Sequence, residues 1–409
     1  MKMKKIGLLF MVFMVVVSCK DATDQEPQEG MWLGSLTVQD NEQLPFNFVL
    51  GKDSNGGITV ELINGEERIL LENVLLDNDS ILIKSPVFEG YISGRYTSSS
   101  IEGEFIKESL DRFVSFKAEH GDQNRFKVKK RPTMNISGIW ETEFSPNTED
   151  SYFGKGIFTQ KGDKVTGTFR TTTGDYRYLE GVMDGDSLKL SVFDGAHAFL
   201  FTAKATDSSL NGIFYSGNHF QEPFVARRNE SYELPDPDSL TFIKPGFEKF
   251  GFSFPNDKGT LVSLEDDRYK NKVVVVQIMG TWCPNCLDES KFLVNYLKNN
   301  DHANLEVVAL AFEYAKTEEG AFKGINRLKS AIGIEYPILL AQYGTSNKSK
   351  AQEKLPMLNH VLSYPTTLII DKKGAVRKIH TGFNGPATGA KYEVFKKKFD
   401  EFVKKLANE

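Results

Sequence analysis

Two patterns of apolar residues divide this chain near residue 235. Between residues 30 and 230, short runs such as residues 58–62 alternate apolar and polar positions, and turn residues separate them. A period of two with frequent turns is typical of an antiparallel all-β sandwich or barrel. Beyond residue 240, continuous apolar runs such as residues 273–279 alternate with stretches of helical spacing. We therefore predict a multidomain protein, in which an all-β region precedes an α/β domain.

The β-rich region contains an internal repeat. Short segments recur in the same order about 105 to 111 residues apart. One such match could arise by chance, whereas several in register indicate a duplicated β-module. We predict copies at residues 30–120 and 136–230, each with six to eight short strands, which form either two barrels or one combined sheet system. The matching segments are Gly30-Met31-Trp32 with Gly138-Ile139-Trp140, Asp79-Ser80-Ile81 with Asp186-Ser187-Leu188, Val87-Phe88-Glu89-Gly90 with Val192-Phe193-Asp194-Gly195, Ser100–Phe105 with Ser209–Phe214, and Phe113-Val114 with Phe224-Val225.

The modules show no catalytic motif. The acidic clusters at residues 77–79 and 184–186 have calcium-ligand residue types, but we interpret them as hairpin turns because further ligands are not apparent. Trp32 and Trp140 are predicted core residues. Basic residues 127–131 are interpreted as a solvated connector between the copies. We expect the modules to act as a spacer or to bind a partner.

The N-terminal segment has the features of an export signal. Lysines at positions 2, 4 and 5 precede a twelve-residue apolar stretch, which is too short to span a membrane and suits a signal-peptide core. Residues 16–19 resemble the lipobox of bacterial lipoproteins, which implies a signal peptide at residues 1–18 and lipidation of Cys19. Residues 19–29 would then be a flexible lipidated tether. An ordinary signal peptide with an incidental cysteine is the alternative.

The α/β region, residues 240–409, begins after a Pro- and Asp-rich linker. Its apolar runs predict a succession of strands and helices that ends in a hairpin and a closing amphipathic helix. The predicted strands are residues 273–279, 305–311, 337–340, 366–370 and 375–380, and the predicted helices are residues 286–299, 320–332, 351–358 and 392–406.

A cysteine pair in this region is the main chemical signal. Residues 282–286 read Trp-Cys-Pro-Asn-Cys, after a buried strand and at the start of a helix. The helix N-terminus favours the thiolate of Cys283, and Cys286 is close enough to form a disulfide with it. The chain has three cysteines, so none remains for a structural disulfide. A zinc site is not expected, because there is no second Cys pair and the six histidines are scattered.

Overall charge and composition exclude some functions. Net charge is −5, with 40% apolar and 26% charged residues, which suits a soluble globular protein and gives no indication of nucleic-acid binding. We predict neither a cofactor nor a bound metal, because dithiol chemistry needs only the two sulfur atoms.

Residues 240–409 resemble the thioredoxin superfamily, in particular its extracytoplasmic TlpA- and ResA-like branch. The resemblance rests on residues 282–286 together with Ser363-Tyr364-Pro365-Thr366-Thr367, and is supported by residues 371–374 and the loop around Gly382. It implies a thiol–disulfide oxidoreductase that acts on disulfide-bearing exported proteins and that a membrane electron donor keeps reduced. Together with the lipobox-like residues 16–19, it implies a lipid-anchored location in the bacterial cell envelope, facing either the periplasm or the exterior.

The resemblance assigns roles to individual residues. Cys283 would be the nucleophile, and Cys286 would be the buried resolving thiol, the two forming the redox-active disulfide. Pro365 would be a cis-proline facing the dithiol. Tyr364 would pair with a substrate strand through its backbone. Trp282, Pro284 and Asn285 would complete the substrate-docking surface.

The proton acceptor differs from that of thioredoxins. Where thioredoxins carry a buried aspartate, this chain has Gln277, which does not titrate. The related branch instead has a glutamate three residues after the second cysteine, and Glu289 occupies that position. Helical spacing places Glu289 one turn from Cys286, so we predict it as the general base. A solvated surface carboxylate is the alternative.

Three functions stay open from the sequence, and the first is a lipid-anchored thiol–disulfide reductase of extracytoplasmic proteins. The branch usually has proline immediately before the second cysteine, whereas this chain has Asn285, so the direction of electron flow is undecided. A thiol peroxidase is less favoured, because Val276 and Gly280 stand where peroxiredoxins have Pro, Thr or Ser. The third function is a non-enzymatic lipoprotein whose modules bind a partner or glycan.

Overall fold

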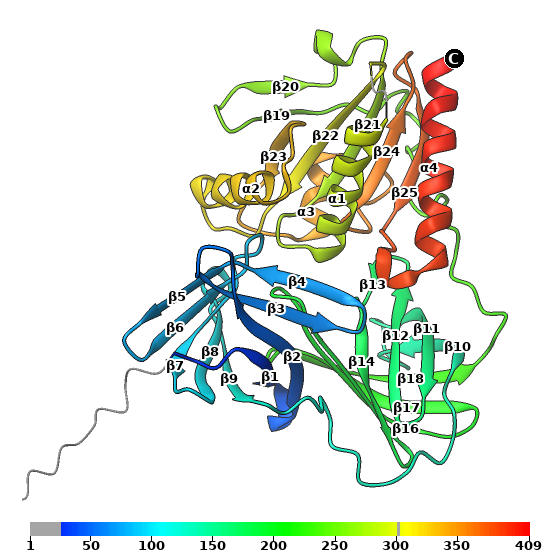
Figure 1. Cartoon of the computed structure of the whole chain (residues 1–409). Helices are drawn as coiled ribbons and strands as arrows, with labels where there is room; N and C mark the ends of the chain where they lie inside the picture. The colour runs from blue at the N-terminus through cyan, green and yellow to red at the C-terminus, as the bar shows by residue number, and fades with distance from the viewer. Residues whose placement is uncertain (1–25, 301–302) are drawn as a thin grey trace, which may run out of the picture.

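The computed structural model describes residues 26–300 and 303–409. The predicted signal peptide and Cys19 lie outside these residues. Within the described residues, the chain forms two antiparallel sheets of nine strands each, one mixed sheet flanked by helices and a separate two-stranded sheet (Figure 1). None of the helices in these residues has the length and apolar character needed to cross a membrane.

The first sheet, module 1, has the strand order β4-β3-β2-β1-β9-β8-β7-β6-β5. The first strand pairs with the last, and the two ends of the order, β4 and β5, are adjacent in the chain. The sheet is therefore barrel-like, with a break between β4 and β5. Its strands are β1 (Gly30–Thr37), β2 (Gln43–Lys52), β3 (Ile58–Asn64), β4 (Glu67–Leu71), β5 (Asn73–Asp77), β6 (Ser80–Lys84), β7 (Tyr91–Tyr96), β8 (Ser100–Lys107) and β9 (Arg112–His120), with short 3-10 helices η1 (Gln39–Asn41) and η2 (Glu108–Leu110).

The second sheet, module 2, repeats this arrangement with the order β11-β10-β18-β17-β16-β15-β14-β12-β13. A further pairing of β11 with β12 closes it into a barrel. Its strands are β10 (Gly138–Phe144), β11 (Tyr152–Lys161), β12 (Lys164–Thr171), β13 (Gly174–Asp175), β14 (Leu179–Asp184), β15 (Ser187–Phe193), β16 (Ala198–Ala205), β17 (Ser209–Ser216) and β18 (Phe220–Arg228).

Each strand of module 1 has a counterpart nine positions later, which supports the inferred duplication. Trp32 and Trp140 are both fully buried, and each indole N–H donates to the carbonyl four residues earlier, at 2.9 Å. The expectation of six to eight strands per copy was wrong. In module 1, a single residue separates β4 from β5, and in module 2, β13 has two residues, so neither boundary carries a cluster of turn residues.

The two modules share apolar surface. The core of module 1 includes Phe193, Leu200 and Tyr215 from module 2, and the Phe193 ring lies 4.5 Å from the Phe46 ring. The modules therefore form separate sheets that pack together, which answers the question of one or two sheet systems. Residues 77–79 and 184–186 lie at the β5–β6 and β14–β15 hairpin turns.

The α/β domain contains a mixed sheet with the order β23-β22-β21-β24-β25. Helices α1 and α4 pack on each other through Phe292 and Phe399, whose rings are 5.0 Å apart. The elements are β21 (Val273–Met279), β22 (Leu305–Phe312), β23 (Ile338–Gln342), β24 (Thr366–Ile370) and β25 (Val376–Thr381), helices α1 (Pro284–Asn299), α2 (Glu318–Ile332), α3 (Lys348–Lys354) and α4 (Ala390–Asn408), the hairpin β19 (Ser253–Pro255) and β20 (Leu261–Ser263), and short helices η3 (Asp267–Tyr269) and η4 (Pro386–Thr388).

Helix α3 differs most from its predicted position. It begins after Asn347, whose side chain accepts a hydrogen bond from the Lys350 amide, and it ends before Pro356. The expected helix at 351–358 placed this proline in its interior, where proline breaks the helical hydrogen bonding. Capping by Asn347 therefore moves the helix toward the N-terminus.

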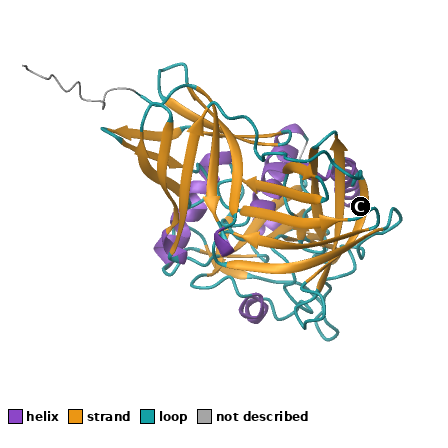
Figure 2. Cartoon of the chain, turned by 90° about the horizontal axis from the view of Figure 1, so that it is seen from below, coloured by secondary structure: helices purple, strands orange, loops and turns teal. Residues whose placement is uncertain are grey.

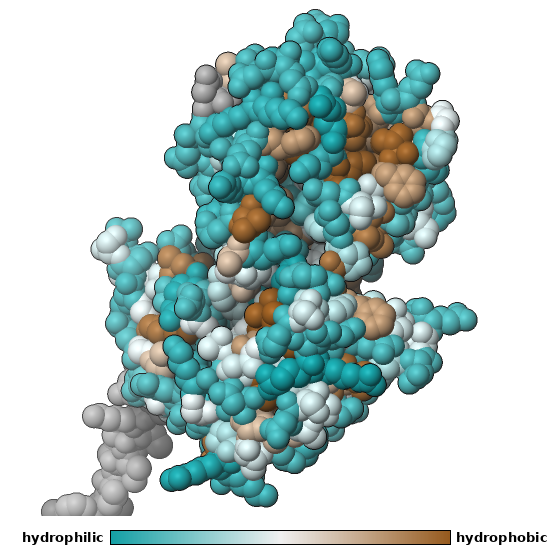
Figure 3. Space-filling view, turned by 90° about the vertical axis from the view of Figure 1, so that its right-hand side faces the viewer, coloured by the Kyte–Doolittle hydropathy of each residue, from teal (hydrophilic) through white to brown (hydrophobic). Residues whose placement is uncertain are grey.

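The α/β domain lies on top of both modules in Figure 1, and the view from below shows the two β-sheets in front of its helices (Figure 2). From the side, the two parts meet at a narrow waist, and the surface is mostly hydrophilic with small apolar patches (Figure 3).

Candidate active site

The sheet topology brings two distant segments together at Cys283. Strand β21 runs antiparallel to β24, with Ile278 opposite Thr366, so the segment after β21 lies beside the segment before β24. The Tyr364–Pro365 peptide bond is cis, the conformation that the family resemblance implied. The Cys283 thiol lies 3.4 Å from the Tyr364 carbonyl oxygen.

Cys283 caps helix α1. Pro284 is the first helical residue, and the Cys283 sulfur accepts a hydrogen bond from the Cys286 amide at 3.2 Å. An amide donor and the positive end of the helix dipole both stabilise a thiolate. Cys286 is fully buried; burial and its hydrogen bond with Cys283 raise the pKa of its thiol well above the ordinary value. Cys286 therefore needs a proton acceptor before it can attack a disulfide.

Glu289 on α1 is the residue predicted to accept that proton. Its side chain is 1% exposed, which excludes the solvated-surface alternative. Burial raises the pKa of Glu289, although hydrogen bonds from Thr367 at 2.6 Å and Gln277 at 2.9 Å stabilise its charged form. Gln277 occupies the position of the thioredoxin aspartate and holds Glu289 in place. A carboxyl group whose pKa lies nearer neutrality is better suited to accept and return a proton.

Glu313 is a site residue that sequence reasoning missed. It follows β22 and accepts hydrogen bonds from the amide and hydroxyl of Thr281, at 2.8 and 2.7 Å. Burial raises the pKa of Glu313 to about 7. The residue holds the turn between β21 and Cys283. No local motif marks it, because its partner lies 32 residues earlier.

The predicted docking residues surround the dithiol but are largely covered. Trp282 is half-buried, its indole N–H donates to the Phe312 carbonyl at 3.0 Å, and its ring meets Tyr364 edge-on at 5.6 Å. Pro284 and Tyr364 are buried, and Asn285 is half-buried. Cys283 itself is 7% exposed. The described residues contain no group of His, Cys, Asp and Glu side chains that could hold a metal ion.

Known proteins resemble the α/β domain. A model of the AhpC/TSA family matches residues 248–379. The thioredoxin-like protein YneN of Bacillus subtilis is 30% identical over 141 residues, which are 34% of this chain and 73% of the relative. The thiol-disulfide oxidoreductase ResA of the same species is 24% identical over 140 residues, 34% of this chain and 69% of the relative. A solved thioredoxin-family thiol:disulfide interchange protein of Chlorobium tepidum is 22% identical, covers 39% of this chain and 95% of its own, and has a TM-score of 0.29.

The chain belongs to the thioredoxin superfamily. It is a thiol–disulfide oxidoreductase, and its C-terminal α/β region is a thioredoxin-like domain. The family match lies within this domain and does not include the two β-modules. Their contacts with the domain are described next.

Loops from both modules contact the thioredoxin-like domain around the dithiol. Val87 and Phe88 of module 1 and Ala196 of module 2 belong to the same apolar cluster as Cys283 and Cys286. Arg327 on α2 donates to the Val87 carbonyl at 2.7 Å. These contacts do not fit a spacer, which would hold the domain at a distance. Both modules instead pack directly against the thioredoxin-like domain.

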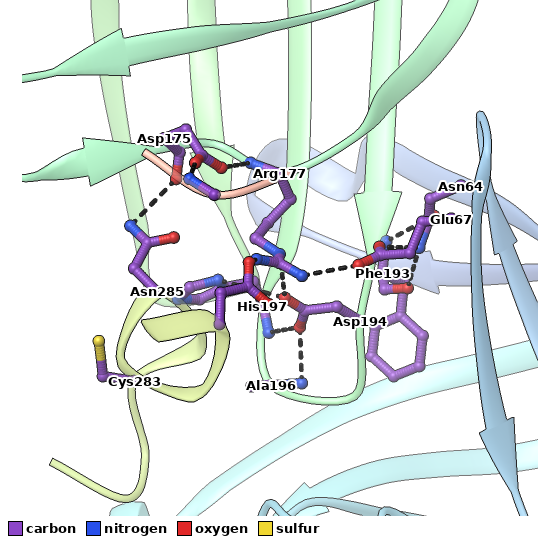
Figure 4. Close-up of polar contacts among 12 residues, drawn as sticks. Asn64, Glu67, Asp175, Arg177, Phe193, Asp194, Ala196, His197, Cys283 and Asn285 are labelled. Atoms are coloured by element: carbon purple, nitrogen blue, oxygen red, sulfur yellow. Dashed lines mark hydrogen bonds and ion pairs between the residues drawn. The ribbon is translucent and has the colours of Figure 1, made fainter. Parts of the chain in front are cut away.

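A buried charge cluster joins all three parts of the molecule. Arg177, just before β14, forms ion pairs with Asp288 on α1, with Glu67 of module 1 at 2.6 Å, and with Asp194 of module 2 at 3.4 Å (Figure 4). Each of these side chains is at most 13% exposed. Burial raises the pKa of Glu67, against the influence of Arg177. Arg177 therefore ties the modules to the helix that carries the cysteines.

One sequence signal pointed to this interface. Of the two repeated Val-Phe-acid-Gly segments, residues 87–90 reach the thioredoxin-like domain, whereas Val192 and Phe193 lie in the cores of the modules. The two segments also meet each other, since a Cβ on Gly90 would lie 2.9 Å from the Gly195 carbonyl. The repeat indicates the duplication, and only the three-dimensional contacts show which copy of the segment reaches the other domain.

Proposed function

We propose that this protein is a lipid-anchored, extracytoplasmic reductase of disulfides in exported proteins, re-reduced by a membrane electron donor. Cys283 is the nucleophile, Cys286 the resolving thiol and Glu289 the general base. The observation that carries this proposal is the buried arrangement of Glu289, held by Gln277 and Thr367 one helical turn from Cys286. The lipobox-like residues 16–19 support the anchor and the location.

The reaction proceeds in two exchanges. The Cys283 thiolate attacks one sulfur of the substrate disulfide, forms a mixed disulfide and releases the other sulfur as a thiolate that takes up a proton. Glu289 then accepts the Cys286 proton, and the Cys286 thiolate attacks the Cys283 sulfur. The second substrate sulfur leaves as a thiolate and is protonated. The substrate gains two electrons and two protons, and the protein ends as the Cys283–Cys286 disulfide.

Cys283→Ser tests the assignment of the nucleophile. We expect it to abolish insulin reduction by the protein with dithiothreitol as donor, while Cys286→Ser accumulates the mixed disulfide. Retained reduction by Cys283→Ser would refute the proposed mechanism. The direction of electron flow is tested by the equilibrium reduction potential of the pair in residues 20–409. A value near or below about −220 mV supports a reductase, whereas about −120 mV indicates an oxidant.

Glu289→Gln tests the general base. Single-turnover release of the second substrate thiol should slow by about 10²-fold or more, while the first exchange at Cys283 stays unchanged. In the wild type, the release rate should fall as pH drops through the raised pKa of Glu289, because the protonated carboxyl group accepts no proton. The variant should lose this pH dependence. An unchanged rate and profile would remove Glu289 from the mechanism.

A thiol peroxidase receives less support. Val276 and Gly280 offer no side-chain hydroxyl, and the Thr281 hydroxyl near Cys283 donates to Glu313. We therefore expect hydrogen peroxide consumption far below the rate of disulfide reduction. The non-enzymatic alternative is not supported either, because the Bacillus relatives carry the names of thioredoxin-like and thiol–disulfide oxidoreductase proteins.

A further inference from the structure

A turn of module 2 lies against the segments that flank the dithiol. Residues 172–175, which contain the β12–β13 turn and the short strand β13, contact Asn285, Ser363 and the loop at residues 382–385. Ser363, next to Tyr364, donates to the Thr173 carbonyl at 2.9 Å. Asn285, between the cysteines, donates to the Asp175 carbonyl at 3.3 Å (Figure 4). We call Asn285, Ser363, Tyr364 and the loop at residues 382–385 the docking face.

The turn contacts this face as a neighbouring strand would. Gly174 forms a parallel backbone bridge with Phe383, and the Gly385 amide donates to the Asp175 carboxylate at 2.7 Å. The turn and the docking face approach each other closely at both Thr172 and Gly174. A Cβ on Gly382 would lie 2.8 Å from the Thr172 carbonyl oxygen, and one on Gly174 would lie 2.0 Å from the Asn285 amide nitrogen. The backbone of the turn therefore occupies space where a bound polypeptide strand would run.

The turn satisfies the docking face incompletely. The Asn285 side-chain oxygen and the Tyr364 hydroxyl are buried without a hydrogen-bond partner. Buried polar groups are nearly always paired, so each is available for a donor or acceptor that the turn does not supply. A polypeptide with free backbone amides and carbonyls could make these bonds as well as those of the turn.

We propose that residues 172–175 are an internal occupant of the docking face, and that a disulfide-bearing polypeptide reaches Cys283 only after displacing them. Arg177, two residues beyond the turn, holds it in place through Asp288. The inference rests on the proposed function only for the identity of the incoming substrate. The covering of Cys283 can be measured without any turnover.

Alkylation of Cys283 tests the covering. In the reduced full-length Cys286→Ser protein, iodoacetamide should modify Cys283 at least about tenfold more slowly than it modifies the cysteine of a free peptide. The two rates are compared at equal thiolate fraction, which is obtained from the pH profile of each reaction. Gly174→Ala should raise the rate about tenfold, because its φ of +148° and the Asn285 contact both disfavour a side chain. Gly162→Ala is the matched control: its φ is also positive, at +65°, but a Cβ there meets nothing within 4 Å. Equal rates in all three proteins would overturn the proposal.

Hydrogen exchange tests the displacement in the protein without the glycine substitution. The probe is a ten-residue peptide whose single cysteine is activated as a thionitrobenzoate disulfide. Cys283 of the Cys286→Ser variant attacks the peptide sulfur, releases thionitrobenzoate and retains the peptide as a mixed disulfide. Amides of residues 170–177 should then lose protection, whereas those of the β16–β17 pair should not. Undiminished protection with the peptide bound would refute displacement.

The two proposals fail in different ways. If the protein does not reduce insulin but Gly174→Ala exposes Cys283, the reductase function fails and the covering turn stands. If insulin is reduced while Cys283 alkylates at the free rate, the function stands and the covering turn fails.

Discussion

The two β-modules share one strand order and differ in what their loops do. In module 1, the chain after β3 makes a full strand, β4, and the turn before it contacts module 2, where the Gly65 amide donates to Glu180 at 2.7 Å. In module 2, the corresponding β13 has two residues, and its turn lies on the docking face of the thioredoxin-like domain. A duplicated scaffold can therefore keep its core while one copy turns a loop into part of an active site.

The repeated acidic loops show the same difference. Glu89 of module 1 accepts hydrogen bonds from Ser109 of its own module, at 2.6 Å for the amide, and from Tyr314, at 3.4 Å. Asp194 of module 2 faces Arg177 and His197 in the buried cluster. Among the described residues, Glu89 thus joins its own module to the thioredoxin-like domain without an ion pair, whereas Asp194 lies in a charged junction of three parts. The predictions below test this asymmetry.

The largest effect is expected at Arg177. Arg177→Met leaves the carboxylates of Asp288, Glu67 and Asp194 buried without their counter-ion, which should lower the free energy of unfolding by about 3–5 kcal/mol. Arg95→Met in module 1 is the control, since the Arg95 side chain is 81% exposed and its pair with Asp79 is worth at most about 1 kcal/mol. Urea unfolding followed by circular dichroism measures both. Equal losses would contradict the special role of the module 2 cluster.

A smaller effect is expected at the repeated acidic position. Asp194→Asn should cost about 2 kcal/mol at pH 7 and Glu89→Gln about 1 kcal/mol, because Asp194 forms ion pairs with Arg177 and His197 in addition to its hydrogen bonds. Urea unfolding at pH 7 compares the two variants directly. An equal loss in the free energy of unfolding at both positions would show that the two loops contribute equally to stability.

The stability effects of these two substitutions should also differ in their dependence on pH. Burial alone would raise the pKa of Asp194, but His197 and Arg177 hold it well below the ordinary 3.8. The native state therefore binds this proton less readily than the unfolded chain, so the contribution of Asp194 is present above about pH 4 and lost as the pH falls. Asp194→Asn should flatten the acid limb of the stability curve between pH 5 and 3. An acid limb identical to that of the wild type would show that Asp194 does not gain from its charge.

The smallest effect is expected where the modules are alike. Trp32→Phe and Trp140→Phe each remove one buried hydrogen bond, and each should cost about 1 kcal/mol. The opposite residues differ, His120 against Trp32 and Arg228 over Trp140, so Trp140→Phe should cost slightly more. Urea unfolding of the two variants gives the comparison. A difference well beyond 1 kcal/mol would show that the cores have diverged as well as the loops.

Several features followed from the sequence because they depend on neighbouring residues. The apolar run of β21, the proline at the start of α1 and the spacing of Cys283, Cys286 and Glu289 are local, and local spacing decides which side chains share a helix face. The alternation in the modules and the repeated Gly-x-Trp segments are local as well. Together they predicted the order of the domains along the chain, the internal repeat and the residues of the dithiol site.

Only the tertiary structure decided what surrounds that site. Arg177 is 110 residues from Glu67 and 111 from Asp288, and the Ser363 contact with Thr173 spans 190 residues. No periodicity links positions so far apart, and β13, at two residues, is too short to show a pattern. The covered dithiol results from how three apolar cores pack against one another, because burial is non-directional and leaves the choice of partner surface to the whole fold.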